Sequence, residues 1–471
     1  MNKSCAWKRV RVFVLLCLAT AMGALAQTFT TIVNFNGSNG STPYDSLVQG
    51  TDGNLYGTTG YGGAFGPNYG TVFRTTTGGT LTTLHSFSGT DGTVPYASLV
   101  LATNGAFYGT TFYGGANDTC TIGYPGCGTV FKITPGGSFT TLLSFSSTYG
   151  TSPQAGLIQA TNGNFYGTAL YGGINGLGTI FKITPAGTPT TLLSFDYTDG
   201  AYPLAALIQA TNGNFYGATD LGGANGYGTI FEITPGGSLT TLHSFNLTDG
   251  EYAYAALIQG TDGNFYGTTE QGGANGYGTI FKITPGGTLN TLHSFDSTDG
   301  AVPFAPLVQG TDGNFYGTTT AGGTSSACSG GCGTVFKIAP GGTLTTVHSF
   351  DSTDGASPLG GLVQCTDGNF YGTTYTAGAQ GFGTVFRLSV GLGPFIRTLP
   401  TSGKAGAAVK ILGTNLTGAT SVSFNGTVAT FTVVSRYLIT TTVPVGASSG
   451  KVRVVTPSGT LSSNVPFRVR P

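Results

Sequence analysis

The sequence predicts an all-β protein, in which a seven-bladed β-propeller closed by its N-terminal strand is followed by an immunoglobulin-like β-sandwich. Three observations predict this fold. Phrases related to TDGNFYGTT (261–269) recur through most of the chain, the repeat is incomplete at both ends in a complementary way, and a different pattern begins after Val390. The predicted division is a signal peptide at 1–26, the propeller at 27–391 and the sandwich at 392–471.

The N-terminal segment has the features of a secretory signal peptide. Basic residues at positions 3, 8, 9 and 11 precede the apolar run VFVLLCLATAMGALA, and ALA at 24–26 is a small-x-small cleavage site. We therefore expect the mature chain to begin near Gln27. Nothing later is apolar for the ~20 residues that a membrane-spanning helix needs, so we predict an exported protein without a transmembrane segment in the mature chain. Its expected location is periplasmic, cell-surface or extracellular.

The repeat has a period near 50 residues, which is typical of a solenoid or a propeller. Residues 257–295 represent one unit, with four strand-like runs: LIQG, NFYGTT, GTIFKIT and LNTLHSF. Four antiparallel strands in each unit describe a propeller blade. The tyrosine of the phrase marks seven copies, at Tyr56, Tyr108, Tyr166, Tyr216, Tyr266, Tyr316 and Tyr371.

Turn signals join the runs within a unit. Asp262-Gly263 between apolar flanks predicts a type I′ hairpin, in which both central residues have positive φ. Pro285-Gly286-Gly287 predicts a second tight reversal. The glycine after the tyrosine, Gly267 in this unit, leaves room for the close approach of a neighbouring strand.

The two ends of the repeat predict ring closure. TTIVNF (30–35) matches a fourth run and has no first three runs before it. The seventh copy supplies three runs, ending with GTVFRLS (383–389), and has no fourth. An N-terminal strand that completes the last blade would remove the open edges of the ring. An open β-solenoid is the alternative, but it would not need complementary ends.

One face of such a propeller carries all of the variable loops. The turns between first and second runs, and between third and fourth, are uniformly short, whereas the other two sets of loops vary in length and content. Function is expected on the variable face. The tyrosines there are interpreted either as stacking platforms for sugars or a protein partner, or as tethers of glycine-rich loops. The candidate ligand-binding residues on this face are Tyr61, Tyr113, Tyr124, Tyr171, Asp220 and Glu270.

Repeated polar positions are interpreted as structural. Histidine shares its position with Leu143 and Leu193 of two other blades, which indicates packing. The glutamines of the first runs, such as Gln309, would form a polar ring bonded to neighbouring backbones. Aspartates in turns such as STDG (297–300) could present oxygens to Ca²⁺, or form Asx turns without a metal. No turn carries the full calcium-loop signature, so no metal residues and no cofactor are assigned.

Cysteine positions predict two local disulfides in an oxidising compartment. Cys120 and Cys127 lie in one enlarged loop, and Cys328 and Cys332 lie in the equivalent loop four blades later. Zinc binding by all four would need loops that should be well separated. Cys365 remains and is expected to be a buried thiol.

The tail resembles the IPT/TIG immunoglobulin-like family. The resemblance rests on Pro400 and Gly403, on the motifs ILGTNL, SVSFNG and VPFRV, and on VP at 443–444 and SG at 449–450. It implies a spacer or interaction module. The repeats resemble the GloVer tandem-repeat family of exported bacterial proteins, through DGNFYGTT, GGANGYGTIFKI and TLHSF, over about residues 30–390. That resemblance supplies no activity.

Composition and the candidate residues favour a binding protein. Acidic and basic residues balance at 18 each, without a basic patch, which argues against a nucleic-acid partner. We predict a non-enzymatic, exported protein that recognises a glycan or a surface protein through the variable face. A carbohydrate-active hydrolase or lyase on that face is the first alternative, although no motif singles out catalytic residues. A structural cell-envelope scaffold is the second.

Overall fold

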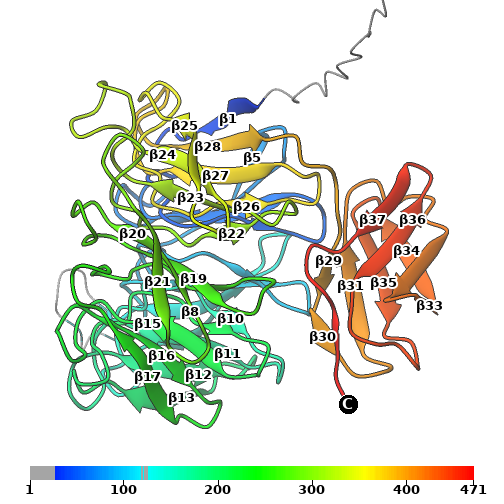
Figure 1. The fold of residues 1–471 in the computed structure, drawn as a ribbon, viewed down its shortest axis with the longest axis horizontal. Helices are drawn as coiled ribbons and strands as arrows, with labels where there is room; N and C mark the ends of the chain where they lie inside the picture. Colours follow the sequence, from blue (N-terminus) through cyan, green and yellow to red (C-terminus); the bar gives the residue numbers. More distant parts are fainter. Residues whose placement is uncertain (1–26, 118–119, 121–125) are drawn as a thin grey trace, which may run out of the picture.

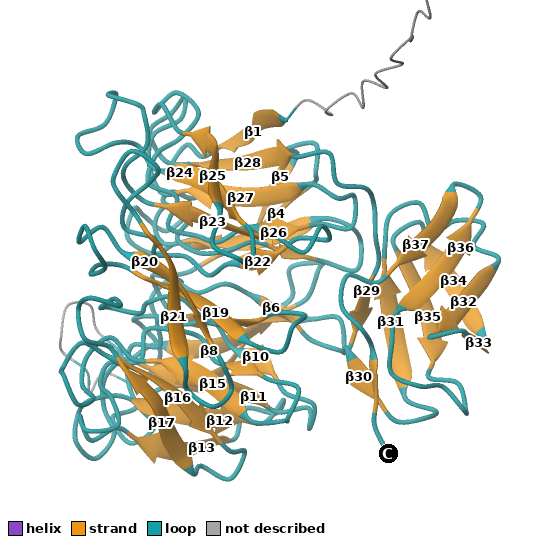
Figure 2. Ribbon diagram, viewed as in Figure 1, coloured by secondary structure: helices purple, strands orange, loops and turns teal. Residues whose placement is uncertain are grey.

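The computed structural model describes residues 27–117, 120 and 126–471. The predicted signal peptide at 1–26 lies outside the described residues, and so does Tyr124. Every regular element in the described part is a strand (Figure 2). The predicted all-β class and the propeller-type arrangement of four-stranded antiparallel sheets are confirmed. The described residues before Val390 contain seven such sheets.

Each sheet follows the chain from its first to its fourth strand. The first sheet contains β2 (Val48–Gln49), β3 (Leu55–Thr59), β4 (Thr71–Thr75) and β5 (Leu81–Ser86). The second contains β6 (Val100–Leu101), β7 (Phe107–Thr111), β8 (Thr129–Ile133) and β9 (Phe139–Ser144). The third contains β10 (Ile158–Gln159), β11 (Phe165–Ala169), β12 (Thr179–Ile183) and β13 (Pro189–Ser194). The fourth contains β14 (Ile208–Gln209), β15 (Phe215–Ala218), β16 (Thr229–Ile233) and β17 (Leu239–Ser244).

The remaining three sheets repeat this order. The fifth contains β18 (Ile258–Gln259), β19 (Phe265–Thr269), β20 (Thr279–Ile283) and β21 (Leu289–Ser294). The sixth contains β22 (Val308–Gln309), β23 (Phe315–Thr319), β24 (Thr334–Ile338) and β25 (Leu344–Ser349). The seventh contains β26 (Val363–Gln364), β27 (Phe370–Thr374), β28 (Thr384–Ser389) and, from the other end of the repeat region, β1 (Thr28–Asn34).

β1 completes the seventh sheet, which is hydrogen-bonded to the first sheet. β1 pairs with β28 in antiparallel register, from Thr28 opposite Ser389 to Asn34 opposite Thr384. The backbone N–H of Thr366 in the seventh sheet donates to Gln49 Oε1 in the first, at 3.0 Å. The equivalent bond links every other pair of neighbouring sheets except the first and second, because Leu101 replaces the glutamine in the second sheet. The six repeated glutamines therefore form a polar ring that is interrupted at the second sheet. The N-terminal strand therefore completes the last sheet and covers its outer edge.

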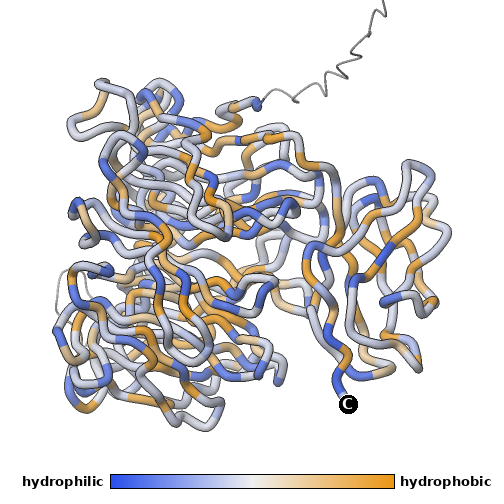
Figure 3. Tube along the Cα trace, viewed as in Figure 1, coloured by the Kyte–Doolittle hydropathy of each residue, from blue (hydrophilic) through white to orange (hydrophobic). Residues whose placement is uncertain are grey.

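The second strand of each sheet supplies the packing between sheets. The Tyr266 ring lies on Phe315 of the next sheet, with ring centroids 4.0 Å apart. Gly267 faces Phe281 of the neighbouring strand, and a Cβ at this glycine would lie 2.6 Å from that ring. A larger residue would collide with the buried ring, which explains the glycine. Hydrophobic segments accordingly run along the strands, whereas the loops are mostly polar (Figure 3).

The turn between the first two strands differs from its prediction. Gly263 has φ +85°, whereas Asp262 is not among the residues with positive φ. The N–H of Gly263 donates to the Gly260 carbonyl at 2.9 Å, as in a type I turn that ends in a left-handed glycine. The type I′ prediction is therefore wrong. Aspartate is favoured here because its carboxylate accepts from the Tyr266 hydroxyl at 2.9 Å.

The C-terminal region forms a separate β-sandwich beside the propeller (Figure 1). One sheet has the order β29 (Arg397–Leu399), β31 (Ala408–Leu412), β35 (Leu438–Thr442) and β34 (Phe431–Ser435). The other has the order β33 (Thr427–Ala429), β32 (Ser421–Phe424), β36 (Val452–Thr456) and β37 (Gly459–Ser462). The short strands β30 (Ser402–Gly403) and β38 (Arg468–Val469) pair in parallel. Buried apolar side chains of both large sheets meet in one core.

The sandwich contacts the face of the propeller that carries the short turns. Lys410 Nζ donates to the Thr103 carbonyl at 2.6 Å, and the Phe395 N–H donates to the Thr366 carbonyl at 3.1 Å. Thr103 and Thr366 both follow the first strand of their sheets, where the short turns begin. The sandwich therefore docks opposite the variable face and leaves the variable loops accessible.

Candidate functional site

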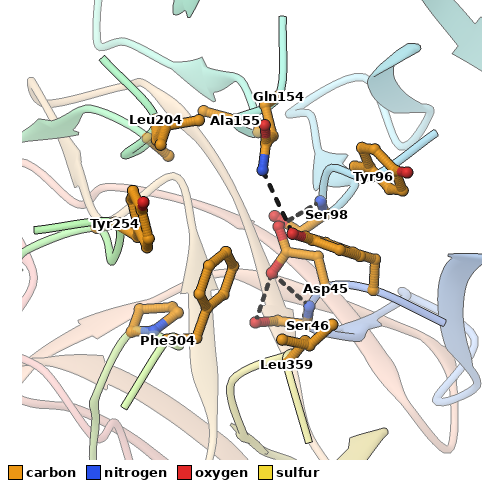
Figure 4. A pocket seen from close by; sticks show the side chains of 15 residues that line it. Asp45, Ser46, Tyr96, Ser98, Gln154, Ala155, Leu204, Tyr254, Phe304 and Leu359 are labelled. Atoms are coloured by element: carbon orange, nitrogen blue, oxygen red, sulfur yellow. Dashed lines mark hydrogen bonds between the residues drawn. The ribbon is translucent and has the colours of Figure 1, made fainter. Parts of the chain in front are cut away.

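The centre of the variable face is lined by one side chain from each sheet. These residues lie four positions before the first strand of their sheet, and the position is varied in an otherwise repeated segment. Together they border a central cavity of about 90 Å³ (Figure 4). The sequence analysis did not predict this ring. The signal that could have found it is a position that varies from repeat to repeat, although it lies between a proline that most repeats share and a leucine that all repeats share. Its members are Tyr44, Tyr96, Gln154, Leu204, Tyr254, Phe304 and Leu359.

Aromatic side chains meet across this ring. The Tyr44 ring lies 5.8 Å from Phe304, and Phe304 lies 5.1 Å from Tyr254, between ring centroids. Gln154 Nε2 donates to the Tyr44 hydroxyl at 3.4 Å (Figure 4). Because these residues come from the first, third, fifth and sixth sheets, they reach across the pore and narrow it. The result is an apolar floor with a few polar atoms.

Asp45 is the single carboxylate that lines this inner cavity. The backbone N–H of Ser98 in the next sheet donates to its Oδ2 at 2.8 Å, and the Ser46 hydroxyl donates to its Oδ1 at 3.1 Å. Burial raises the pKa of Asp45, against the hydrogen bonds from Ser46 and Ser98. The carboxyl therefore joins the first and second sheets, and these partners occupy both of its oxygens.

A larger cavity of about 600 Å³ opens next to this floor. It shares several side chains with the inner cavity and adds residues from the loops that follow the second strands. This volume lies within the range of small-molecule sites. Its lining consists of Tyr44, Gln154, Leu170, Tyr171, Tyr202, Leu204, Asp220, Leu221, Tyr254, Glu270 and Phe304.

Three of the predicted ligand-binding residues meet in this cavity, namely Tyr171, Asp220 and Glu270. Tyr61 and Tyr113 do not line it. The Tyr61 hydroxyl hydrogen-bonds the Tyr96 hydroxyl at 2.9 Å, and the Tyr113 ring packs edge-on against Phe112 at 4.5 Å. Both tyrosines belong to the hydrophobic cluster that also contains Leu170, Tyr202 and Leu204 of the cavity lining. Ligand binding by any of the predicted residues remains a prediction.

Asp220 and Glu270 are equivalent positions of adjacent sheets. Each is held by its backbone, because the Asp220 N–H donates to the Tyr202 carbonyl at 3.2 Å and the Glu270 N–H donates to the Tyr252 carbonyl at 3.0 Å. Both acids lie beside Tyr254, the pore residue of the fifth sheet. The adjacency of two sheets thus places two carboxyl groups and a phenol at one side of the cavity.

The environment of these carboxyls disfavours their ionised forms. Burial, together with the charge of Glu270, raises the pKa of Asp220 to about 7, although a hydrogen bond from Tyr254 opposes the shift. Burial also raises the pKa of Glu270, again against Tyr254. The Oδ1 of Asp220 is buried without a hydrogen-bond partner among the described residues. Asp220 therefore has unused capacity to accept a hydrogen bond at the wall of the cavity.

The repeated aspartates of the variable-face turns are occupied by the protein itself. Asp299 Oδ2 lies 2.7 Å from His293 Nε2, and its Oδ1 accepts from the Asp296 N–H at 3.2 Å. Asp296 in turn accepts from Thr298. Across the described residues, no group of three or more His, Cys, Asp or Glu side chains could hold a metal ion. These turns favour the Asx interpretation over calcium.

Replacing His293 by leucine is expected to leave the fold intact, because Leu143 and Leu193 occupy this position in other sheets. Loss of the partly buried His293–Asp299 pair should lower the free energy of unfolding by about 1 kcal/mol. Urea denaturation of the purified protein measures this. Phe295→Ala is the matched control, since this neighbouring ring is fully buried and its truncation should cost about 3–5 kcal/mol. Equal losses in both variants would contradict a minor role for the histidine.

Both predicted disulfides are present. Cys120 bonds Cys127 and Cys328 bonds Cys332, with Cα atoms 5.2 Å and 5.1 Å apart. Each bond closes one long loop of the variable face. Cys365 is a buried thiol, and burial raises its pKa.

The repeats match an established family. The model of the Gloeobacter/Verrucomicrobia repeat matches residues 21–123 and 119–329. The chain belongs to this family. In this Gloeobacter/Verrucomicrobia repeat protein, the IPT/TIG domain model matches residues 394–469, which form the C-terminal sandwich. IPT/TIG domains mediate protein interactions, so a repeat propeller joined to one fits an extracellular interaction or binding protein.

Solved structures resemble this Gloeobacter/Verrucomicrobia repeat protein in fold. A fungal alcohol oxidase of the AA5 family, in complex with copper, is 13% identical with a TM-score of 0.54; the match covers 94% of this chain and 99% of the oxidase. The extracellular domain of a B. thetaiotaomicron protein described as a hybrid two-component system is 10% identical with a TM-score of 0.49, covering 94% of this chain and 58% of that one. No curated protein matches the chain.

The disulfides and the repeat family indicate an extracellular protein. The described part of the chain contains no helix long and apolar enough to cross a membrane.

Proposed function

We propose that this protein is an exported binding protein that recognises a carbohydrate in the cavity at the centre of its variable face. The observation that carries the proposal is the lining of that cavity, which combines aromatic rings with the carboxyls of Asp220 and Glu270. Aromatic rings stack on the C–H faces of sugars, and carboxylates accept hydrogen bonds from sugar hydroxyls. A volume of about 600 Å³ accommodates a sugar unit rather than a protein segment.

The placement of the sandwich supports this role. It docks on the short-turn face through Lys410 and Phe395, so the cavity stays open while the sandwich engages a second partner. Recognition by a protein partner on the outer variable loops, rather than a glycan in the cavity, is the competing outcome. A structural cell-envelope scaffold would need neither a glycan in the cavity nor a protein partner on the outer loops.

A polysaccharide array probed with residues 27–471 tests the proposal, and each glycan is also assayed for cleavage. Selective retention without cleavage is expected, and EDTA should not reduce it, because the turn aspartates are engaged by His293 and its equivalents. Absence of retention across the array would refute glycan binding. Loss of retention in EDTA would restore calcium as a ligand of these turns.

A hydrolase or lyase in the same cavity is the second candidate. It is favoured by one observation: Asp220 has a pKa of about 7 beside Glu270, which suits a general acid paired with a second carboxylate. Cleavage of a retained glycan that is abolished by Asp220→Asn would establish this function. Cleavage that persists in Asp220→Asn and Glu270→Gln would exclude both residues as its catalysts.

A further inference from the structure

Charge is divided between the two faces of the propeller. No lysine or arginine occurs in any of the segments that form the variable face, which run from the second to the third strand and from the fourth strand to the next first strand. The basic residues of the repeats all lie in the third strands, opposite the second-strand tyrosines and toward the short turns, as Lys282 lies opposite Tyr266. They are Arg74, Lys132, Lys182, Lys282, Lys337 and Arg387.

The variable face, by contrast, is rich in carboxylates. Turns such as STDG (297–300) add acids at its rim in five of the seven connections between sheets, and Asp220, Glu251 and Glu270 add them near its centre. A cleft that carries carboxylates without lysine or arginine raises the local concentration of cationic ligands. The distribution therefore favours cationic ligands over neutral or anionic ones.

In the lining of the cavity, the carboxyls of Asp220 and Glu270 lie among aromatic rings, and no basic side chain neutralises their charge. The cavity lining contains Asp220, Glu270 and the rings of Tyr254, Tyr171 and Phe304, but no Lys, Arg or His. An aromatic wall that carries carboxylates is the arrangement that binds an ammonium group, through the ring faces and through charge-assisted hydrogen bonds. The Oδ1 of Asp220 is buried and has no hydrogen-bond partner among the described residues, so this carboxyl at the cavity wall has unused acceptor capacity. Rotation of the Asp220 carboxyl about χ2 can present either oxygen.

We propose that the cavity recognises an amino sugar through its free ammonium group, which the carboxylates of Asp220 and Glu270 receive while the Tyr254 ring packs against the sugar. This inference rests on the proposed carbohydrate-binding function and specifies its ligand class.

The proposal implies that affinity depends on pH. The groups that face Asp220 are acids or phenols and include no base, so its proton is the one that an incoming cation displaces. Since the ionised carboxylate binds the ammonium and the protonated form does not, affinity for a permanent cation should rise as pH increases through about 7. These groups are Glu251, Glu270, Tyr171, Tyr202, Tyr252 and Tyr254.

Isothermal titration of residues 27–471 with three tetrasaccharides tests the proposal: a glucosamine tetramer, its fully N-acetylated form, and a glucose tetramer. The glucosamine tetramer should bind about 10-fold to 100-fold more tightly than the two neutral tetramers. The double variant Asp220→Asn, Glu270→Gln should lose this preference, so that it binds all three tetramers with similar affinity. Because it removes two poorly solvated carboxyls, it should melt no lower than the unmodified protein. Each single variant provides the same comparison.

Tetramethylammonium serves as the permanent cation in a second series at pH 5.5, 7 and 8.5. Its affinity should increase with pH in the unmodified protein and be independent of pH in the double variant. Equal affinity for all three tetramers would overturn the amino-sugar inference and leave carbohydrate binding in place. Binding of tetramethylammonium without any tetramer would overturn carbohydrate binding and leave the cation site. Binding of none of the four probes would overturn both.

Discussion

Deletion of residues 27–35 is expected to abolish cooperative folding of the propeller. The deletion removes β1, which forms the outer strand of the seventh sheet through its pairing with β28. It also removes the fully buried Phe35, the buried Val33, and Phe29, whose ring stacks on His348 at 3.8 Å. Burial of each such side chain contributes about 1.5–3 kcal/mol. Their combined loss, at about 5 kcal/mol or more, approaches the total stability of an ordinary domain.

Thermal unfolding followed by far-ultraviolet circular dichroism measures the effect of this deletion. Thr30→Ala is the matched control, because Thr30 lies in the same strand with an exposed side chain and should leave the melting curve unchanged. A synthetic peptide of residues 27–36 should restore the folded signal of the truncated protein, since the vacated strand edge can accept it. An unchanged melting temperature after deletion would contradict the role of β1 in ring closure.

The sequence predicts the scaffold well because the same structural unit is repeated along the chain. Each repeat places the same tyrosine and glycine, and an aspartate or asparagine in the turn, in the same environment, so one unit explains all units. The packing of Tyr266 against Phe315 of the next sheet follows from that pattern. The turn type was mispredicted because Asp262-Gly263 suits two hairpins. In the turn that forms, the Asp262 carboxylate accepts a hydrogen bond from the Tyr266 hydroxyl, and the sequence alone does not predict this contact.

The site is harder to predict because it depends on the departures from the repeat. The sequence identifies Asp220 and Glu270 as candidate ligand-binding residues, and their equivalent positions in adjacent sheets bring them together. Their pKa shifts could not be anticipated, since these follow from burial beside Tyr254. The ring of residues around the central cavity could not be predicted, because the residue type changes from sheet to sheet, as Tyr44, Gln154 and Phe304 show. Only closure of the ring makes these residues neighbours.

Tyr254→Ala is expected to weaken binding of the glycan retained on the array by about 30-fold, which corresponds to the ~2 kcal/mol of a central contact residue. Tyr254 borders both cavities and packs against Phe304 at 5.1 Å. Removing its ring therefore takes away the stacking surface and opens the floor. Isothermal titration with that glycan measures the loss. Tyr254→Phe keeps the ring and should cost only about 3-fold.

The two substitutions separate the ring of Tyr254 from its hydroxyl. The hydroxyl lowers the pKa of both Asp220 and Glu270, so Tyr254→Phe should raise the pKa of each carboxyl further. Binding of tetramethylammonium in this variant should then require a higher pH, whereas binding of a neutral glycan should not. Tyr277→Ala is the matched control, because Tyr277 is 43% exposed on the same face and lies outside both cavities. If Tyr277→Ala weakened glycan binding as strongly as Tyr254→Ala, recognition would lie on the outer loops, where the tyrosines would act as anchors for a partner rather than as walls of a pocket.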